Sequence, residues 1–269
     1  VSYAASVPRS DATPPFPNQM GTTTPHVTSE QRTKFWDDGY FVFDTGVPHE
    51  TLDRIVEQLA SKYPPDDMPH GYVTPTRLQD AWEFNDDVRD LATNPHVLGV
   101  LQGLYGRKPL PFQTLNFPTG TRQAAHSDTI HFNSLPHTFM CGVWVAFEDI
   151  DMENGPLIYY PGSNKLPEFT MADAGVKKAS SKHYPVYEKF IQQVIQEFGL
   201  QPSYGTIKKG QALVWSSNLL HGGAPQNDPA RSRHSQVTHF YFEGCRYYTP
   251  LDSQGLNVHW RDPRWSEPR

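Results

Sequence analysis

Three segments in the first 110 residues carry apolar side chains at helical spacing. The segment that starts at Ser29 has an acidic first turn and an aromatic face, so we expect a helix capped by Ser29 and ended by Gly39. The same spacing predicts helices over 48–59 and 94–105.

From about residue 110 onward, short apolar runs are separated by Gly and Pro, a pattern typical of strands. The exception lies within 166–209, where apolar residues recur at helical spacing over 186–198 and predict a helical insertion. The runs that we predict to be strands are 40–43, 111–117, 138–147, 157–160, 211–215 and 235–242. The fold class expected is mainly β with supporting helices.

The division of the chain follows from the same pattern. Residues 1–27 are rich in Pro, Ser and Thr and lack periodicity, so we expect an N-terminal arm that is mobile or draped over the surface. Residues 28–269 are predicted to form a single domain, with the helical insertion at about 166–209. An all-β domain of this length is common.

Composition narrows the possible partners. The chain of 269 residues has 37% hydrophobic residues, enough for a core, and a net charge of −6 without a basic block. A nucleic-acid partner is therefore not expected. No apolar stretch approaches a membrane span, no secretory signal is visible, and two cysteines do not make a disulfide scaffold. These features favour a cytoplasmic protein, while its oligomeric state stays open.

One motif carries potential metal chemistry. His126 and Asp128 are two residues apart, so on a strand their side chains would share a face, and His221 follows another apolar run. Two imidazoles and one carboxylate form the facial triad of non-haem Fe(II) oxygenases. Taken alone, a His-x-Asp pair is weak, because an Asp that orients a structural His gives the same pattern. The presence of a third candidate ligand, His221, favours a metal site over a structural His–Asp pair.

A second pattern follows His221. Arg233 and Ser235 would also share a strand face, and a guanidinium can hold the far carboxylate of an oxo-acid in two-pronged fashion. The alternatives are a surface salt bridge for Arg233, or Arg231 in the same role. Spacing alone favours Arg233. Other histidines, including His131 and His239, are more simply interpreted as satisfied or exposed.

Together with several other segments, these motifs make the chain resemble the phytanoyl-CoA dioxygenase (PhyH-like) family of Fe(II)- and 2-oxoglutarate-dependent oxygenases. The similarity runs from about residue 28 to 250 and preserves the order and spacing of several segments. These segments are Phe35-Trp36-Asp37-Asp38-Gly39-Tyr40, the stretch 120–128 that ends in His126-Ser127-Asp128, the stretch 143–149, Asn154-Gly155-Pro156-Leu157, Pro161-Gly162-Ser163-Asn164-Lys165 and Leu220-His221-Gly222-Gly223.

The resemblance implies a double-stranded β-helix, the jelly-roll or cupin-like fold. It implies Fe(II), 2-oxoglutarate and O2 as metal and cosubstrates, with ascorbate in support. The residues that it implies as metal ligands and catalytic centre are His126, Asp128 and His221; those that it implies for 2-oxoglutarate are Arg233, Ser235, Gln113, Thr114, Gln123 and Trp144. The implied activity is hydroxylation of an unactivated C–H bond of a small molecule, with release of succinate and CO2.

Some alternatives remain open. Desaturation, cyclisation or epimerisation would use the same site, although Asp128 counts against halogenation, since related halogenases carry a small residue there. A non-catalytic jelly roll with a structural metal is a distant alternative, because structural zinc sites are normally closed and rich in Cys. The substrate, including a CoA thioester, is not defined. The cations that could bind an anionic group, though each is more often surface charge, are Arg77, Arg122, Lys165 and Lys182.

Overall fold

The computed structural model describes residues 26–63, 77–177, 180–253 and 257–268. The predicted N-terminal arm, residues 1–27, therefore lies almost entirely outside the described part. In the described part, no helix is both long and apolar enough to cross a membrane. The α-helices are α1 (Ser29–Asp38), α2 (His49–Leu59), α3 (Asp86–Ala92), α4 (Pro95–Tyr105) and α5 (Tyr184–Glu197).

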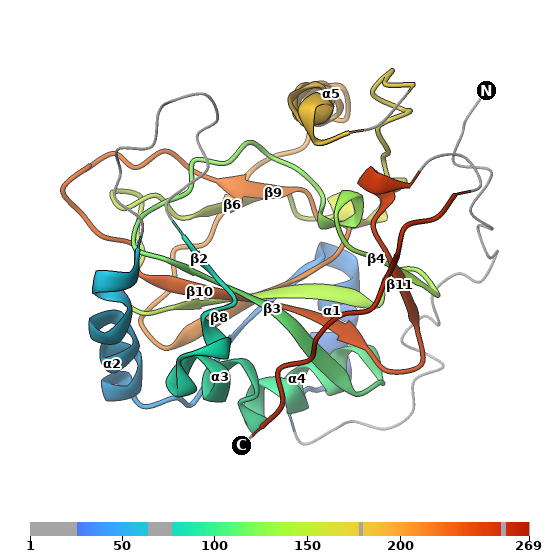
Figure 1. The fold of residues 1–269 in the computed structure, drawn as a ribbon. Coiled ribbons are helices and arrows are strands. Elements are labelled where there is room, and N and C mark those ends of the chain that lie inside the picture. Colours follow the sequence, from blue (N-terminus) through green and yellow to red (C-terminus); the bar gives the residue numbers. More distant parts are fainter. Residues whose placement is uncertain (1–25, 64–76, 178–179, 254–256, 269) are drawn as a thin grey trace.

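A six-stranded sheet, antiparallel throughout, forms the centre of the fold (Figure 1). Its order is β1 (Tyr40–Asp44), β8 (Gln211–Ser216), β5 (Met140–Ala146), β10 (Ser235–Phe242), β3 (Pro109–Phe117) and β2 (Leu78–Gln79). Neighbours in this sheet are far apart in sequence, as in jelly rolls, which bring distant strands side by side. Each strand predicted from sequence is present, with bounds shifted by at most two residues.

Two three-stranded sheets complete the β structure. One consists of β7 (Ser203–Tyr204), β6 (Leu157–Tyr159) and β9 (His221–Gly223), and the other of β12 (Trp260–Arg261), β11 (Arg246–Tyr248) and β4 (Asn133–Leu135). The first lies over one face of the central sheet, with α5 beyond it (Figure 1). The predicted fold class, mainly β with supporting helices in a jelly roll, is confirmed.

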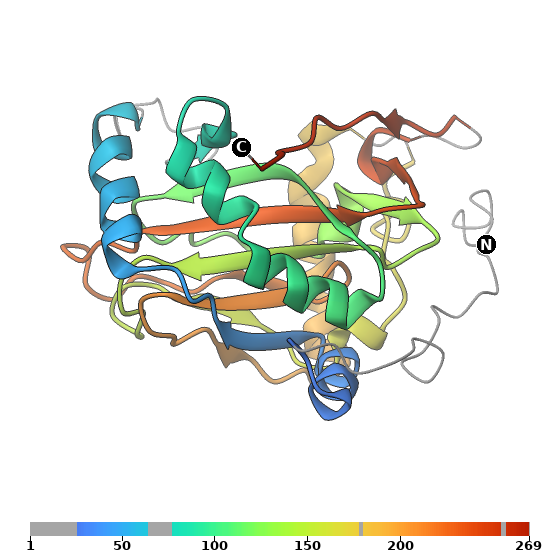
Figure 2. The same cartoon turned by 90° about the horizontal axis from the view of Figure 1, so that it is seen from below.

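The two faces of the central sheet bury different clusters. One face packs on the N-terminal helices, which lie against the sheet when it is viewed from below (Figure 2). The opposite face buries Leu115, Trp144, Leu213, Trp215 and other apolar side chains under β6 and β7. Because side chains alternate along a strand, every second residue of β3, β5, β8 and β10 points to this second face. We call it the inner face.

Helix ends follow their local sequence. The cap of α1 is Thr28 and not Ser29 as predicted, because the Thr28 hydroxyl accepts from the Gln31 backbone N–H while the Gln31 side chain accepts from the Thr28 N–H. Gly39 ends α1 in the left-handed conformation, at φ 86°. Its backbone carbonyl then accepts from Ser216, which places the chain beside β8.

Candidate metal centre

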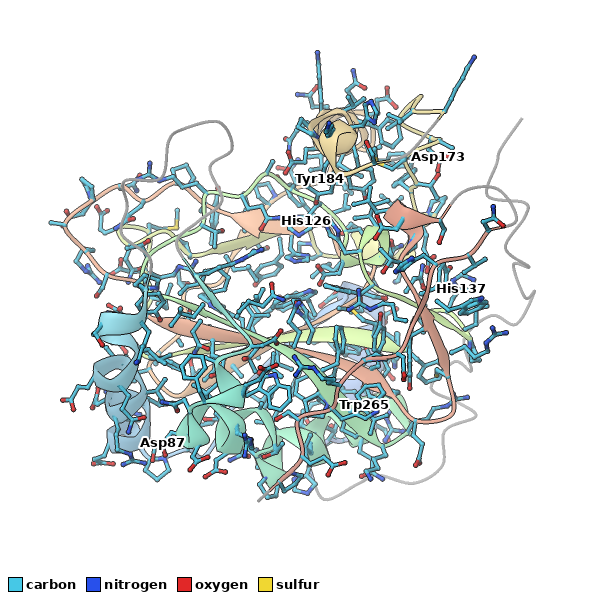
Figure 3. All side chains as sticks on the ribbon, in the orientation of Figure 1. Asp87, His126, His137, Asp173, Tyr184 and Trp265 are labelled. Carbon is cyan, nitrogen blue, oxygen red and sulfur yellow. The ribbon has the colours of Figure 1, made fainter. Side chains whose placement is uncertain are left out.

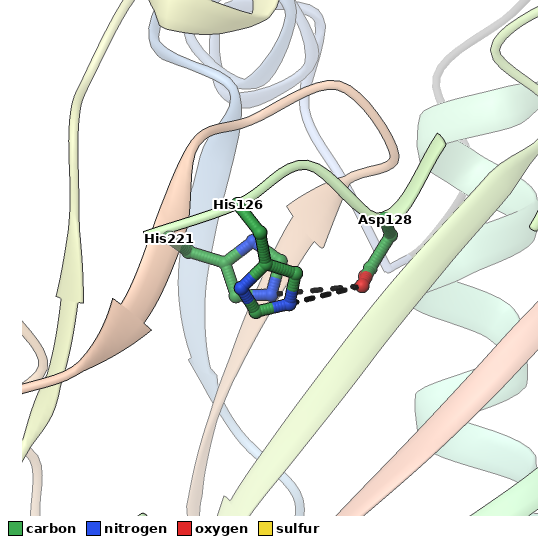
Figure 4. A group of neighbouring side chains, drawn as sticks. All are labelled: His126, Asp128 and His221. Atoms are coloured by element: carbon green, nitrogen blue, oxygen red, sulfur yellow. Dashed lines mark ion pairs between the residues drawn. The ribbon is translucent and has the colours of Figure 1, made fainter. Parts of the chain in front are cut away.

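Two histidines come together through the backbone. His126 and His221 form an antiparallel bridge in which each N–H donates to the other's carbonyl at 2.9 Å. Their ring centroids are 4.6 Å apart. Ser127 continues the chain in extended conformation, and Asp128 then opens a short 3-10 turn, Asp128–Ile130. We expected His126 and Asp128 to lie on a strand, but His126 forms only an isolated bridge and Ser127 is one extended residue. The Asp128 carboxylate still points towards both imidazoles (Figure 4).

The ligand atoms of these three residues converge. Oδ1 of Asp128 lies 3.7 Å from Nε2 of His126 and 3.8 Å from Nε2 of His221. Candidate ligand atoms from all three residues lie within 4.8 Å of one another, and each residue is at most 5% exposed. Figure 3 shows His126 between the central sheet and α5. Three buried donors on one side of a common point can hold one metal ion.

Hydrogen bonds outside this group orient each ligand. Nδ1 of His126 is 3.0 Å from the Ala124 carbonyl, and Nδ1 of His221 is 2.9 Å from the Leu219 carbonyl. A carbonyl can only accept, so Nδ1 carries the proton and Nε2 keeps its lone pair. The Trp215 indole N–H donates to Oδ2 of Asp128 at 2.7 Å, which leaves Oδ1 directed at the histidines. This outer arrangement is the one that metal ligands require.

Burial and neighbouring charges shift the pKa of two of the ligands, Asp128 and His126. Burial alone would raise the pKa of Asp128, but His221, His239, His126 and the Trp215 hydrogen bond lower it to about 2. Burial is the main reason that the pKa of His126 falls to about 4, with a contribution from His221. At neutral pH these two groups offer a carboxylate and a neutral imidazole, so protons do not compete with a metal there.

His239 lies beside this group, although no functional role was predicted for it from the sequence. Its Nδ1 is 3.0 Å from Oε1 of Gln113, and its Nε2 is 3.8 Å from Oδ2 of Asp128. Ser235 and His239 are four residues apart on β10 and therefore share the inner face. That spacing was the available signal. Sequence reasoning interpreted His239 as satisfied or exposed; it is satisfied through Gln113, but it also borders the metal ligands.

A second cluster lies further along the inner face, around Arg233. This residue is 3% exposed, donates from Nη1 to the Ser235 hydroxyl at 3.1 Å, and its guanidinium carbon is 5.4 Å from the Trp144 ring centroid. Burial lowers the pKa of Arg233 to about 10, although Glu148 opposes this. Its Nε and the Nε1 of Trp144 are buried donors without a hydrogen-bond partner. Two orphaned donors at a buried cation form a ready site for an anion.

Arg231, the other candidate for binding an oxo-acid carboxylate, lies outside this cluster. Arg231 is partly exposed, and its Nη1 lies 3.4 Å from Oδ2 of Asp151 at the surface. Of the two arginines that the sequence left open, Arg233 is therefore the buried one. Gln123 lies at the metal group, with Nε2 3.4 Å from Nε2 of His126.

Thr114 does not join the other predicted residues. It pairs with Thr238, whose hydroxyl accepts from Gln236, and Gln236 also donates to the Val88 carbonyl in α3. Thr114 therefore faces the helices, while its neighbour Gln113 faces His239. Strand alternation separates the two adjacent residues, and we leave Thr114 out of the site.

Proteins of similar sequence identify the family of this chain. A sequence model described as phytanoyl-CoA dioxygenase (PhyH) matches residues 35–235. The chain belongs to the phytanoyl-CoA dioxygenase family. A probable phytanoyl-CoA dioxygenase of Caenorhabditis elegans is 26% identical over 187 residues, covering 57% of this chain and 59% of that protein. The chain thus spans less than two thirds of that relative. The human peroxisomal phytanoyl-CoA dioxygenase is 23% identical over 260 residues, covering 86% and 72%.

Solved structures show the same fold. EctD from S. alaskensis with 2-oxoglutarate and 5-hydroxyectoine has a TM-score of 0.66 at 16% identity, covering 93% of this chain and 89% of that one. SnoK, a non-heme alpha ketoglutarate dependent carbocyclase from nogalamycin biosynthesis, has a TM-score of 0.63 at 15% identity, covering 91% and 97%. The family resemblance seen in the sequence is therefore confirmed.

Proposed function

We propose that this protein is an Fe(II)- and 2-oxoglutarate-dependent dioxygenase that hydroxylates an unactivated C–H bond of a small molecule. The observation that carries the proposal is a buried triad whose ligand atoms converge, together with a buried arginine on the inner face that forms no ion pair with a carboxylate among the described residues. Family membership supports it. So do solved neighbours described with bound Fe or with 2-oxoglutarate.

In this proposal His126, Asp128 and His221 hold the iron. The hydrogen bonds from the two histidines to the Ala124 and Leu219 carbonyls, and from the Trp215 N–H to Asp128, keep the three ligand atoms pointing inward. When bound, iron with 2-oxoglutarate supplies the activation of O2, with succinate and CO2 as coproducts. The protein contributes positioning and a site from which water is largely excluded, since all three ligands are buried.

Arg233 would bind the distal carboxylate of 2-oxoglutarate, and Ser235 would orient the guanidinium through its hydroxyl. Trp144 offers its orphaned indole N–H to the same carboxylate. Gln123 borders the metal end of the cosubstrate. Gln113 would act indirectly, because its amide oxygen is hydrogen-bonded to His239 and is not available to 2-oxoglutarate. This assignment gives each orphaned donor around Arg233 a partner.

Hydroxylation is favoured because Asp128 occupies the position at which related halogenases have a small residue. Desaturation, cyclisation and epimerisation remain the alternative outcomes, since they would use the same ligands. Identification of the product by mass distinguishes them once a substrate is available: hydroxylation adds one oxygen atom, whereas desaturation removes two hydrogens.

The experiment that tests the proposal needs no substrate. Purified protein is incubated with Fe(II), ascorbate, O2 and 2-oxoglutarate, and succinate is quantified for the wild type, Asp128→Ala and Arg233→Ala. We expect slow succinate release in the wild type, none above background in Asp128→Ala, and a much higher 2-oxoglutarate requirement in Arg233→Ala. Arg231→Ala is the matched control, because it removes an arginine two residues away at the surface.

Two results would count against the proposal. Equal succinate release in Asp128→Ala and wild type would place the chemistry elsewhere. No turnover, combined with failure of the iron-loaded protein to bind 2-oxoglutarate without O2, would favour a non-catalytic jelly roll.

A further inference from the structure

A buried asparagine, Asn218, contacts the segment that carries two of the metal ligands. Ser127 stands between His126 and Asp128 and is fully buried, and its hydroxyl donates to Oδ1 of Asn218 at 3.2 Å. Asn218 is itself only 7% exposed and lies three residues before His221, the third ligand. Its side chain therefore contacts the segment of the first two ligands, and its backbone leads to the third.

The other end of the Asn218 amide holds the residues at which the helical insertion begins. Its Nδ2 donates to the Leu166 carbonyl at 2.7 Å and to the Asn164 carbonyl at 3.3 Å. A carbonyl can only accept, so the amide nitrogen must face these two carbonyls and the amide oxygen must face Ser127. Asn218 thus bridges the metal-binding segment and the start of the insertion.

Neighbouring hydroxyls keep the Ser127 end of this bridge in place. The Thr129 hydroxyl lies 2.6 Å from that of Ser127 and can donate to it, which leaves the Ser127 proton for Oδ1 of Asn218 and for the Ser217 carbonyl at 3.1 Å. A displacement of Ser127 would leave the buried Asn218 oxygen without this donor, and an unsatisfied buried acceptor costs free energy. The positions of Ser127 and Asn218 are therefore linked.

The insertion helix α5 packs behind the same ligands. One apolar cluster contains Tyr187 and Ile191 from the buried face of α5. Ala125 and Leu220, which each directly precede a histidine ligand, belong to this cluster too, and Leu166 packs against it. Successive side chains of an extended segment point to opposite sides, so α5 covers the side away from the imidazoles. Docking of α5 and the geometry of the metal ligands therefore depend on the same two segments.

We infer that Asn218 couples occupation of the metal site to docking of the insertion, so that a bound metal and the docked α5 stabilise each other. The inference rests on the proposed function, because it requires a metal at the triad. A metal held by His126 and Asp128 fixes Ser127 between them, and Asn218 transmits this constraint to Leu166. Coupling is reciprocal, so the docked insertion must favour metal binding by the same factor. Asn218 is thus a positioning residue that acts on the metal ligands through Ser127.

Hydrogen exchange measures this coupling without turnover. The full chain is first titrated with Mn(II), and amide exchange in α5 is then followed by mass spectrometry with and without saturating Mn(II). The helix α2, on the opposite face of the central sheet, is the internal reference for general stabilisation by the metal (Figure 2). In the wild type, Mn(II) should slow exchange in α5 at least about fivefold more than in α2, the lower end of the usual coupling between two sites. In Asn218→Ala this difference should disappear, and Mn(II) should bind more weakly.

The matched control variant is Asn154→Ala. Asn154 is also a buried amide with both ends in use, since Oδ1 accepts from the Asp151 N–H at 3.0 Å and Nδ2 donates to the Asp149 carbonyl at 3.1 Å. Its loss should lower the melting temperature but keep the effect of Mn(II) on α5. Ser127→Ala cuts the proposed link at its other end, so it should behave as Asn218→Ala does, and the double variant should lose no more than either single one. If Asn218→Ala does not fold, Ser127→Ala decides.

Three results would overturn the inference while the wild type still binds Mn(II). Exchange in α5 could be slowed equally in the wild type and Asn218→Ala, or no more than in α2, or Asn154→Ala could lose the effect as completely as Asn218→Ala, because a general loss of stability would then explain both. Failure of the proposed function gives a different result. If the wild type does not bind Mn(II) at all, the metal centre itself is wrong, and the coupling is refuted with it.

Discussion

The two oxygens of Asp128 have separate tasks. Oδ1 faces the two histidines, while Oδ2 accepts the hydrogen bond from Trp215 and lies near His239. The sequence motif located the carboxylate but not the donor that orients it, because Trp215 lies 87 positions away along the chain. From sequence alone, Trp215 was an unremarkable aromatic residue of a core strand.

Replacement of Trp215 by Phe tests this positioning role. The ring is kept but the N–H is lost, so Oδ2 is no longer held and Asp128 can rotate. We expect metal affinity to fall by roughly 10- to 100-fold, the usual effect of losing an outer hydrogen bond to a ligand. Titration with Mn(II) measures it. Trp36→Phe is the control, because Trp36 donates to the Leu104 carbonyl on the helix side; equal affinities in all three proteins would refute the role.

Acid should destabilise the metal-free protein through its buried histidines. The pKa of His126, His131 and His239 is lowered to about 4 from 6.5, so between these values the unfolded chain binds more protons than the folded one. The free energy of unfolding must then decrease as the pH falls from about 6.5 towards 4. Denaturant titrations across this range measure the slope.

A pair of variants assigns that slope. His239→Gln should make it shallower, because one of the three histidines no longer titrates. His259→Gln changes an exposed histidine and should leave it as in the wild type. A free energy of unfolding that is constant between pH 6.5 and 4.5 would show that the buried histidines are not held neutral.

At the scale of elements, the pairing of β5 with β8 sets the position of Trp215. Gly142 is its cross-strand partner, and a Cβ at Gly142 would overlap the indole ring. The missing side chain lets the ring lie against Gly142 while its N–H donates to Asp128. Hydrophobic patterning predicted both strands correctly, but it contains no information on which residues face each other. The positions of the strands could therefore be predicted from the sequence, but their register could not.

The variant Gly142→Ala should act on the metal site through this contact. The indole ring must shift, so Asp128 loses its donor, and overpacking of this kind typically costs about 1–3 kcal/mol of stability. We expect weaker Mn(II) binding together with a lower melting temperature. Val143→Ala, on the helix side of the same strand, should lower the melting temperature without changing Mn(II) affinity. Unchanged affinity in Gly142→Ala would contradict the link.

The fold of the whole molecule brings together candidate functional residues from segments that are distant in sequence. The metal group uses the turn at 126–128 and β9, and the Arg233 cluster uses the start of β10 together with β5. Residue types and motif spacing were enough to single out His126, Asp128 and His221, which the structure brings together, and to favour Arg233, which is buried. They were not enough for Thr114 or His239, because the face to which a residue points depends on strand register and on bulges such as the one between His239 and Phe240.

One site should bind both a metal and 2-oxoglutarate, and calorimetric titration of 2-oxoglutarate in the absence of O2 measures whether it does. With Fe(II), the wild type should bind one equivalent; Asp128→Ala should not bind, and Arg233→Gln should bind at least about tenfold more weakly because a charged contact is lost. Arg231→Gln should match the wild type. Binding that needs no Fe(II), or that is as tight in Arg233→Gln as in the wild type, would show that 2-oxoglutarate does not bind between the metal ligands and Arg233.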